Sequence, residues 1–211
     1  KIIGIETNGR IMSGTTVTDL TFDDLLYTGD FHRLESFDDA IVAIGESVLT
    51  GIDGNYSWSR DGISWNIDTT AEILDITKWN GKYYAISGGG GLVSSSDLES
   101  WKGVTTSPGN SALLASSNER LVLVLSDGTV STSTNAIDWS PPVATDGSTD
   151  TPRILRFLNG EFWLVRNSAL YRSSDGINWS TSNLAGVRDI TYAGGNYFAG
   201  YGPNASLYKS S

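Results

Sequence analysis

The sequence contains no cysteine and a single histidine, His32. Zinc–thiolate sites, iron–sulfur clusters and cysteine nucleophiles are therefore excluded, and at most one imidazole base is available. The chain has no run of 18 apolar residues, so we expect no membrane insertion. It also lacks long Ala/Glu/Lys/Leu stretches at a helical period, while β-forming and turn residues are plentiful. These features predict an all-β protein.

Basic residues are few relative to acidic ones. The chain has 14 Lys and Arg against 24 Asp and Glu, which gives a formal net charge of −10. A chain this acidic repels phosphate backbones, so nucleic acid is not an expected partner. Its 211 residues are enough for one substantial core, and we predict a single domain over residues 1–211.

One phrase recurs along the chain and ends each time in an aromatic ring. The rings lie at positions 22, 65, 101, 139 and 179, so the spacings are 43, 36, 38 and 40 residues. The most degenerate copy is Thr16–Phe22, which keeps only the hydroxyl and the ring. The other four copies carry Ser59, Asp61, Gly62 and Trp65; Ser95, Asp97 and Trp101; Ser133 and Trp139; and Ser173, Asp175, Gly176 and Trp179.

The residues upstream of each phrase read as three short strands joined by tight turns. Asn80-Gly81, Asn159-Gly160 and Gly194-Gly195 are hairpin signals, and a fourth strand begins at each closing ring. A four-strand meander of this length is typical of a propeller blade. We therefore predict a β-propeller of four-stranded antiparallel blades, about five to six in number, with the ring closed by a blade shared between the termini. The repeat units run approximately over 1–22, 23–65, 66–101, 102–139, 140–179 and 180–211.

The repeated phrase resembles the Asp-box, or bacterial neuraminidase repeat, whose usual form is Ser/Thr-x-Asp-x-Gly-x-Thr-Trp/Phe. Here the Asp and the ring are one residue closer, and glycine directly follows Asp, as in hairpins of many bacterial and phage surface proteins. The resemblance implies a propeller on an extracellular or virion surface. It also implies that the repeated Ser, Asp, Gly and Trp hold the hairpin together at the blade periphery, away from the ligand.

The same resemblance raises the possibility of a sialidase-like glycoside hydrolase. Such enzymes use three arginines on the substrate carboxylate, a Tyr nucleophile with a Glu partner, and an acid/base residue. No arginine of this sequence lies in a matching context. The doublets Asp23-Asp24 and Asp38-Asp39 read as solvated turns, and Gly88–Gly91 reads as a hairpin rather than a phosphate loop. We therefore expect no catalytic residues, no cofactor and no metal.

Binding is the function that the residues favour. Trp58, Trp79 and Trp163 lie outside the ring-closing position, and with Tyr192 they are candidate ligand-binding residues. The alternative is that these rings fill the core between blades. We predict a non-catalytic propeller that recognises a glycan or a protein surface. A structural module of a larger phage tail or secreted protein, attached to other domains or chains, is the other possibility; the first residue, Lys1, fits a chain cut from something longer.

Overall fold

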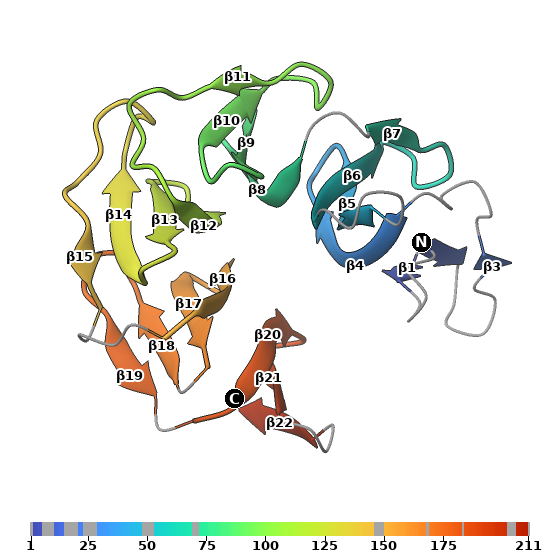
Figure 1. Ribbon diagram of the computed structural model, residues 1–211. Coiled ribbons are helices and arrows are strands. Elements are labelled where there is room, and N and C mark those ends of the chain that lie inside the picture. Colours follow the sequence, from blue (N-terminus) through green and yellow to red (C-terminus); the bar gives the residue numbers. More distant parts are fainter. Residues whose placement is uncertain are drawn as a thin grey trace. The chain divides into compact units, whose positions relative to one another are not determined.

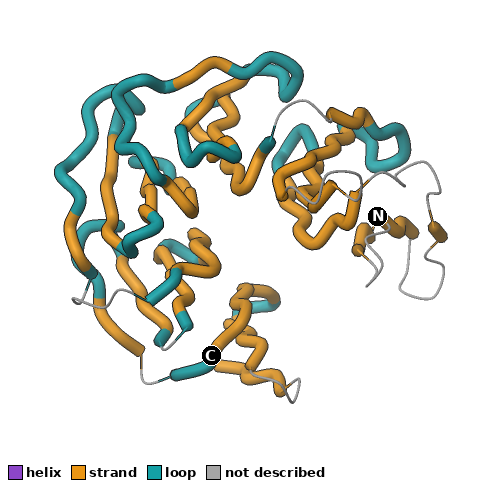
Figure 2. Tube along the Cα trace, viewed as in Figure 1, coloured by secondary structure: helices purple, strands orange, loops and turns teal. Residues whose placement is uncertain are grey.

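The computed structural model shows strands, turns and loops, and no helix occurs in the part of the chain that it describes (Figure 2). Accordingly, no described segment is a helix long and apolar enough to cross a membrane. The described residues are 2–5, 11–14, 21–22, 29–47, 53–68, 72–145, 150–167, 169–182, 184–201 and 206–210.

The described strands pair with their neighbours in the sequence to form six antiparallel sheets (Figure 1). The first sheet holds β1 (Ile2–Ile5), β2 (Ile11–Gly14) and β3 (Thr21–Phe22), and the last holds β20 (Val187–Ala193), β21 (Asn196–Tyr201) and β22 (Ser206–Ser210). The four sheets between them are complete four-stranded blades. They are β4 (Gly29–Ser36), β5 (Ile41–Ser47), β6 (Asp53–Ser59) and β7 (Asn66–Asp68); β8 (Ile73–Trp79), β9 (Lys82–Ser87), β10 (Leu92–Ser95) and β11 (Lys102–Gly103); β12 (Ser111–Ser116), β13 (Leu121–Leu125), β14 (Thr129–Ser133) and β15 (Val143–Ala144); and β16 (Pro152–Leu158), β17 (Glu161–Arg166), β18 (Leu170–Ser173) and β19 (Ser180–Ser182).

The predicted all-β propeller of four-stranded antiparallel blades is confirmed. Each fourth strand follows its tryptophan, so the complete blades span 29–68, 73–103, 111–144 and 152–182. The two terminal sheets have three strands each among the described residues, and their union in one shared blade stays a prediction. The degenerate phrase at 16–20 and the doublet Asp23-Asp24 lie outside the described residues.

The first-to-second strand connections follow from the predicted turn chemistry. Asn80 and Gly81 have φ of 49° and 75°, and Asn159 and Gly160 have φ of 49° and 86°. Two successive residues with positive φ are what a two-residue type I′ hairpin requires, and Asn-Gly meets that requirement with little strain. The Asn-Gly hairpins predicted from the sequence are therefore confirmed.

The chain folds as two compact units. The first comprises Lys1–Lys78, Lys82–Gly89 and Val93–Lys102, and the second comprises Trp79–Gly81, Gly90–Leu92 and Gly103–Ser211. In the first unit, side chains of β5 and β6 pack on side chains of β8 and β9 around the fully buried Tyr56, Ile73 and Tyr83.

Among the described residues of the second unit, two cores lie between successive blades. One joins β12–β14 to β16–β18 around Val122, Phe162 and Tyr171. The other joins β17 and β18 to β20 and β21 and contains Trp163, Leu170, Ile190 and Ala199. The second strands β13 (LVLVL) and β17 (EFWLVR) are buried along almost their whole length, and successive side chains point to opposite faces, so each of these sheets presents apolar side chains on both faces. Burial between blade faces thus stabilises each unit.

Candidate functional site

The four repeat turns, residues 59–65, 95–101, 133–139 and 173–179, share one hydrogen-bond pattern. In the turn 173–179, the Ser173 hydroxyl accepts the Gly176 N–H at 2.8 Å and donates to Asp175 Oδ1 at 2.9 Å. Asp175 Oδ1 in turn accepts the N–H groups of Ile177 and Asn178 at 2.9 and 2.8 Å. The same bonds recur around Ser59 and Asp61, Ser95 and Asp97, and Ser133 and Asn135.

These bonds give the turn carboxylates a structural task. Backbone N–H groups stabilise the charged form of Asp61 and Asp97 and hold their pKa values below the ordinary range. Burial opposes the ionisation of Asp175, but the backbone N–H groups of Asn178 and Ile177 still lower its pKa. A carboxylate that is fully ionised and already accepts several hydrogen bonds is a poor general acid or base at neutral pH. The repeat turns are therefore built to fix the backbone.

The residue after Asp or Asn in each repeat turn lies in the left-handed region, with φ between 60° and 71°. Gly62 and Gly176 adopt this conformation readily, while Leu98 and Ala136 adopt it at a cost of about 1–2 kcal/mol. Leu98 is fully buried in the core of the first unit, which offsets that strain.

The rings that close the repeat turns pack inward. Trp101 lies on the core of the first unit and donates its Nε1–H to the Tyr56 hydroxyl at 2.8 Å, so it ties β6 to the next blade. Trp179 packs on the core between β12–β14 and β16–β18 and donates to the Gly176 carbonyl at 3.2 Å. Trp65 packs against Phe31 and Ala43, and Trp139 is half-buried.

The four candidate ligand-binding rings do not converge on one site. Trp58, Trp79 and Trp163 are 6, 5 and 8% exposed, and Trp58 and Trp163 belong to different cores. Tyr192 is half-buried at the end of β20. Only Trp163 and Tyr192 are brought near each other: both rings pack on Tyr197, at centroid distances of 5.0 and 4.8 Å.

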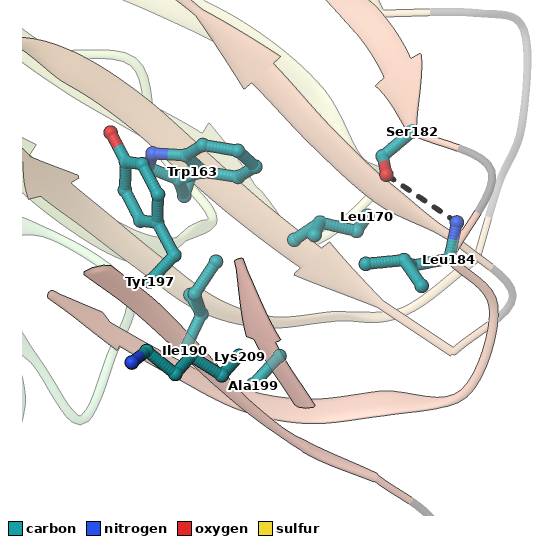
Figure 3. A pocket seen from close by; sticks show the side chains of 8 residues that line it. All are labelled: Trp163, Leu170, Ser182, Leu184, Ile190, Tyr197, Ala199 and Lys209. Atoms are coloured by element: carbon teal, nitrogen blue, oxygen red, sulfur yellow. Dashed lines mark hydrogen bonds between the residues drawn. The ribbon is translucent and has the colours of Figure 1, made fainter. Parts of the chain in front are cut away.

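A pocket of about 350 Å³ opens beside this aromatic group, between the blade β16–β19 and the sheet β20–β22 (Figure 3). In the close-up, the rings of Trp163 and Tyr197 lie together at one end, and Leu170 and Leu184 lie side by side at the other. The lining residues are Trp163, Leu170, Ser182, Leu184, Ile190, Tyr197, Ala199 and Lys209. A volume of this size holds one or two large side chains or a small ligand.

The polar groups of this lining are hydrogen-bond donors. The Ser182 hydroxyl accepts the Leu184 N–H at 3.4 Å, and a serine hydroxyl also carries a proton that it can donate. Lys209 contributes the charged group among the eight lining residues, and no Asp or Glu is among them, although the chain carries 24 acidic residues. An apolar occupant that carries an acceptor or an anionic group suits this lining.

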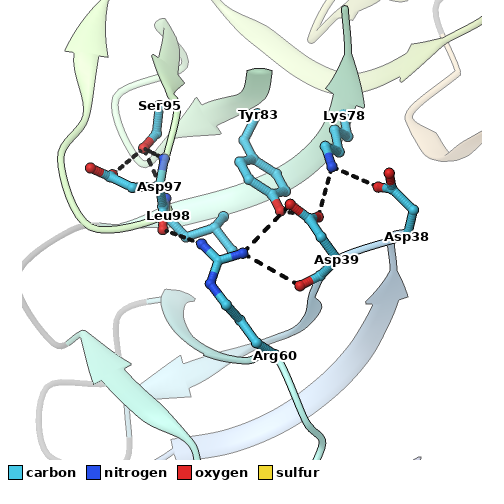
Figure 4. Close-up of polar contacts among 8 residues, drawn as sticks. All are labelled: Asp38, Asp39, Arg60, Lys78, Tyr83, Ser95, Asp97 and Leu98. Carbon is cyan, nitrogen blue, oxygen red and sulfur yellow. Dashed lines mark hydrogen bonds and ion pairs between the residues drawn. The ribbon is translucent and has the colours of Figure 1, made fainter. Parts of the chain in front are cut away.

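A second group of polar residues joins two blades of the first unit (Figure 4). Lys78 donates to Asp38 Oδ1 at 2.6 Å and to Asp39 Oδ1 at 2.7 Å, and the Tyr83 hydroxyl donates to Asp39 Oδ1 at 2.5 Å. Arg60 Nη2 donates to the Asp97 carbonyl at 3.2 Å. The predicted solvated doublet Asp38-Asp39 is thus exposed but also bonded to the next blade.

The pKa values of this cluster argue against acid–base chemistry near neutrality. Burial and the hydrogen bond to Asp39 raise the pKa of Tyr83 to about 12. Burial opposes ionisation of Asp39, but hydrogen bonds from Lys78 and Tyr83 lower its pKa, and Asp38 and Asp39 in turn raise the pKa of Lys78. Tyr83, Asp39 and Lys78 are thus held in their ordinary charge states, so the cluster serves as a clasp between blades.

Sequence reasoning missed most of the pocket. Leu170, Leu184, Ile190, Ala199 and Lys209 were not singled out from the sequence, since nothing in their local pattern distinguishes a pocket wall from a filled core. His32 lies in β4, but its side chain is not among those described. In the described part of the chain, no three His, Asp or Glu side chains gather as metal ligands would.

Comparison with known proteins adds the family and the fold. A family model described as the DUF6242 beta propeller domain matches residues 44–153, which is just over half of the chain. No curated protein matches the sequence.

Solved structures of other proteins are similar to the chain at low identity. PorZ of Porphyromonas gingivalis, described as an essential bacterial surface component of the type-IX secretion system, gives a TM-score of 0.72 at 15% identity over 98% of this chain and 29% of PorZ. YCF48 bound to D1 peptide gives 0.65 at 14% identity over 90% of this chain and 68% of that one. YCF48 from Cyanidioschyzon merolae gives 0.66 at 13% identity over 98 and 78% of the two chains. At these identities the likeness shows the propeller fold alone.

Proposed function

This chain belongs to the DUF6242 β-propeller domain family, and we propose that it is a non-catalytic interaction module that binds a protein partner through the pocket between the blade β16–β19 and the sheet β20–β22. The observation that carries the proposal is the pocket itself, an apolar hollow walled by Trp163 and Tyr197 with Leu184 at 40% exposure. Apolar pockets with one aromatic wall are where interfaces concentrate their binding energy. YCF48, one of the similar structures, is described as bound to a peptide.

The absence of catalytic chemistry is part of the same proposal. Among the described residues, ionisable groups come together in the repeat turns, in the Lys78–Asp39 clasp, and in the pairs of Arg33 with Glu35 and Asp75 and of Arg156 with Asp189. Hydrogen bonds lower the pKa values of Asp97 and Asp39 and raise that of Lys78, so these groups keep their ordinary charge states. Incubation of the protein with sialosides and common aryl glycosides is expected to give no hydrolysis; turnover above the buffer rate would overturn this part.

A glycan is the alternative ligand. Sugars stack on exposed aromatic faces, whereas Trp58, Trp79 and Trp163 are each at least nine-tenths buried, which favours a protein partner. We also propose that the repeat turns are relatives of the Asp-box and that the protein acts on a cell or virion surface. The shared hydrogen-bond pattern supports the first point, and the surface role described for PorZ supports the second.

The test is a selection of random peptides displayed on phage against the full chain, with Leu184→Arg as counter-selection and a glycan array in parallel. Leu184 lines the pocket from a loop, so the charged substitution spoils the apolar lining without entering a core. We expect peptides that are enriched on the wild-type chain and lost on Leu184→Arg. Peptides that bind the Leu184→Arg variant as well as the wild-type chain would show that the partner binds outside the pocket. Glycans that bind the wild-type chain but not Leu184→Arg would show that the ligand of the pocket is a sugar and not a protein.

A further inference from the structure

A one-residue bulge recurs at the same place in the first strands β4, β12, β16 and β20. The pairing register shifts there, and the residues left out of the pairing are His32, Ala112, Arg153 and Arg188. A bulge changes the direction of the side chain of the extra residue and often lies beside a functional site. On β16 and β20, in the second unit, the bulges present two arginines in succession, and both side chains are exposed.

These two arginines, called the arginine pair below, stand on neighbouring strands of the second unit (Figure 1). Arg156 Nη2 on β16 lies 3.4 Å from Asp189 Oδ1 on β20, and side chains of both strands share one core. Because sheets that pack face to face lie about 10 Å apart, the backbones at Arg153 and Arg188 are about that far from each other. Arginine side chains are long enough to bring both guanidinium groups to one carboxylate across that distance.

The positive charge of the arginine pair is not neutralised by the described part of the chain. Among the described residues, neither Arg153 nor Arg188 forms an ion pair. Asp189, the sequence neighbour of Arg188, pairs with Arg156 instead. Arg153 donates its Nε–H to Asn167 Oδ1 at 2.5 Å, a bond that orients the side chain through one of the five N–H donors of a guanidinium. The pair therefore forms a positive site in a chain of net charge −10.

The arginine pair lies at the same end of the sheets as one end of the pocket. The pairings of β16 with β17 and of β17 with β18 place the lining residue Leu170 two strands from Arg153. Leu184, which lies beside Leu170 in the pocket (Figure 3), is in the connection that leads into β20 and Arg188. Two strand spacings amount to about 10 Å, a distance that an extended peptide covers in about three residues.

We infer that the protein partner of the proposed function presents an acidic residue to Arg153 and Arg188, about three residues along an extended segment from the large apolar residue that enters the pocket. The pocket supplies apolar burial, and the arginine pair supplies charge-assisted hydrogen bonds to the carboxylate. The net charge of −10 repels an acidic segment from the rest of the surface, so the pair also selects where the segment binds. This inference rests on the proposed function and adds the chemistry of the ligand to it.

The test extends the phage selection to variants of the arginine pair. Random peptides selected on the full wild-type chain are screened against the double variant Arg153→Gln, Arg188→Gln. Arg172→Gln is the control, because Arg172 is an exposed arginine of the same unit, on β18. Among the peptides that Leu184→Arg abolishes, we expect Asp or Glu to be enriched about three residues from a large apolar residue. These peptides should bind the double variant about five-fold more weakly and Arg172→Gln with unchanged affinity.

One selected peptide and its copy with Gln or Asn in place of the acidic residue are then compared by fluorescence anisotropy. On the wild-type chain the neutral copy should bind about five-fold more weakly, and on the double variant the two peptides should bind equally. The preference for the acidic peptide should shrink between about 0.05 and 0.5 M NaCl, because salt screens exposed charges.

The outcomes separate this inference from the proposed function. Peptides that depend on Leu184 but bind the double variant with unchanged affinity would overturn this inference and leave the proposed function standing. An equal loss on Arg172→Gln would mean that the partner responds to net charge and not to the arginine pair, which would also overturn it. A selection that yields no peptide dependent on Leu184 would overturn the proposed function and this inference together.

Discussion

The hydroxyl of Tyr56 links two elements of the first unit: it accepts the Trp101 Nε1–H at 2.8 Å and donates to the Leu98 carbonyl at 2.7 Å. Trp101 closes the repeat turn of one blade, and Tyr56 lies on β6 of the preceding blade, where its side chain is fully buried. Burial raises the pKa of Tyr56 to about 12, although the bond from Trp101 opposes the rise. The hydroxyl therefore stays protonated and bonded throughout the physiological range.

Replacing Tyr56 with Phe should destabilise the chain by about 2 kcal/mol, because a buried carbonyl and an indole N–H each lose their hydrogen-bond partner. The free energy of unfolding in urea, followed by circular dichroism, measures the change. Tyr192→Phe is the control, since that half-buried ring packs on Tyr197 at the edge of its sheet. An equal loss of unfolding free energy in both variants would mean that the hydrogen bonds of Tyr56 add nothing to stability beyond those of an ordinary tyrosine hydroxyl.

Two glycines with positive φ separate backbone strain from steric overlap. A Cβ on Gly160, at φ 86°, meets no atom within 4 Å, whereas a Cβ on Gly176, at φ 71°, would lie 2.6 Å from Val122 Cγ2. Gly160→Ala should cost about 1 kcal/mol from the left-handed conformation alone. Gly176→Ala should cost about 1–3 kcal/mol more because it overpacks the core between blades. Urea unfolding of both variants tests this order, and equal losses would contradict it.

Two arginine–aspartate pairs differ in burial, so they should differ in how much each contributes to the stability of the fold. Arg33 Nη2 lies 2.8 Å from Asp75 Oδ1, and the Asp75 side chain is fully buried; Arg156 Nη2 lies 3.4 Å from Asp189 Oδ1, and the Asp189 side chain is 58% exposed. Arg33→Met should destabilise the chain by about 3–5 kcal/mol, because it leaves a buried carboxylate without its cation. Arg156→Met should cost less than about 1 kcal/mol. Thermal unfolding of both variants is the measurement, and a larger loss in Arg156→Met would refute the burial argument.

Stability should fall in acid partly through the repeat turns. The pKa values of Asp61 and Asp175 are lowered in the folded state, so their contribution is present above the ordinary aspartate pKa of about 3.9 and is lost as the pH falls below it, through the folded-state pKa. The turn at Ser133 already uses an amide, Asn135, for the same bonds. The double variant Asp61→Asn, Asp175→Asn should therefore fold but lose less stability between pH 7 and pH 2.5 than the wild-type chain. Urea titrations at the two pH values measure the difference, and an unchanged acid sensitivity would contradict the assignment.

The repeat turns were predictable in part. Gly62 and Gly176 signal a positive φ directly, since glycine adopts that conformation without strain. Leu98 and Ala136 carry no such signal, yet the structure gives them the same conformation, because the Ser and Asp or Asn bonds and the burial of the side chain outweigh the strain. The candidate site was less predictable: of the four rings chosen from the sequence, only Trp163 lines the pocket, and Tyr197, which joins it to Tyr192, had no distinguishing local pattern.

The sequence by itself determined the recurring four-strand unit. Turn residues, alternation and the Ser-x-Asp bonds act over a few neighbouring residues, and local interactions of this kind can be read directly from a repeated phrase. Only the tertiary structure decided which rings are buried and where a hollow remains, because Trp163 and Ile190 meet across two sheets that are separate in the sequence. The fit between blade faces depends on side chains from both blades at once. The residues that hold each repeat turn together are therefore visible in the sequence, while the residues that line the pocket had to be found in the space between blades.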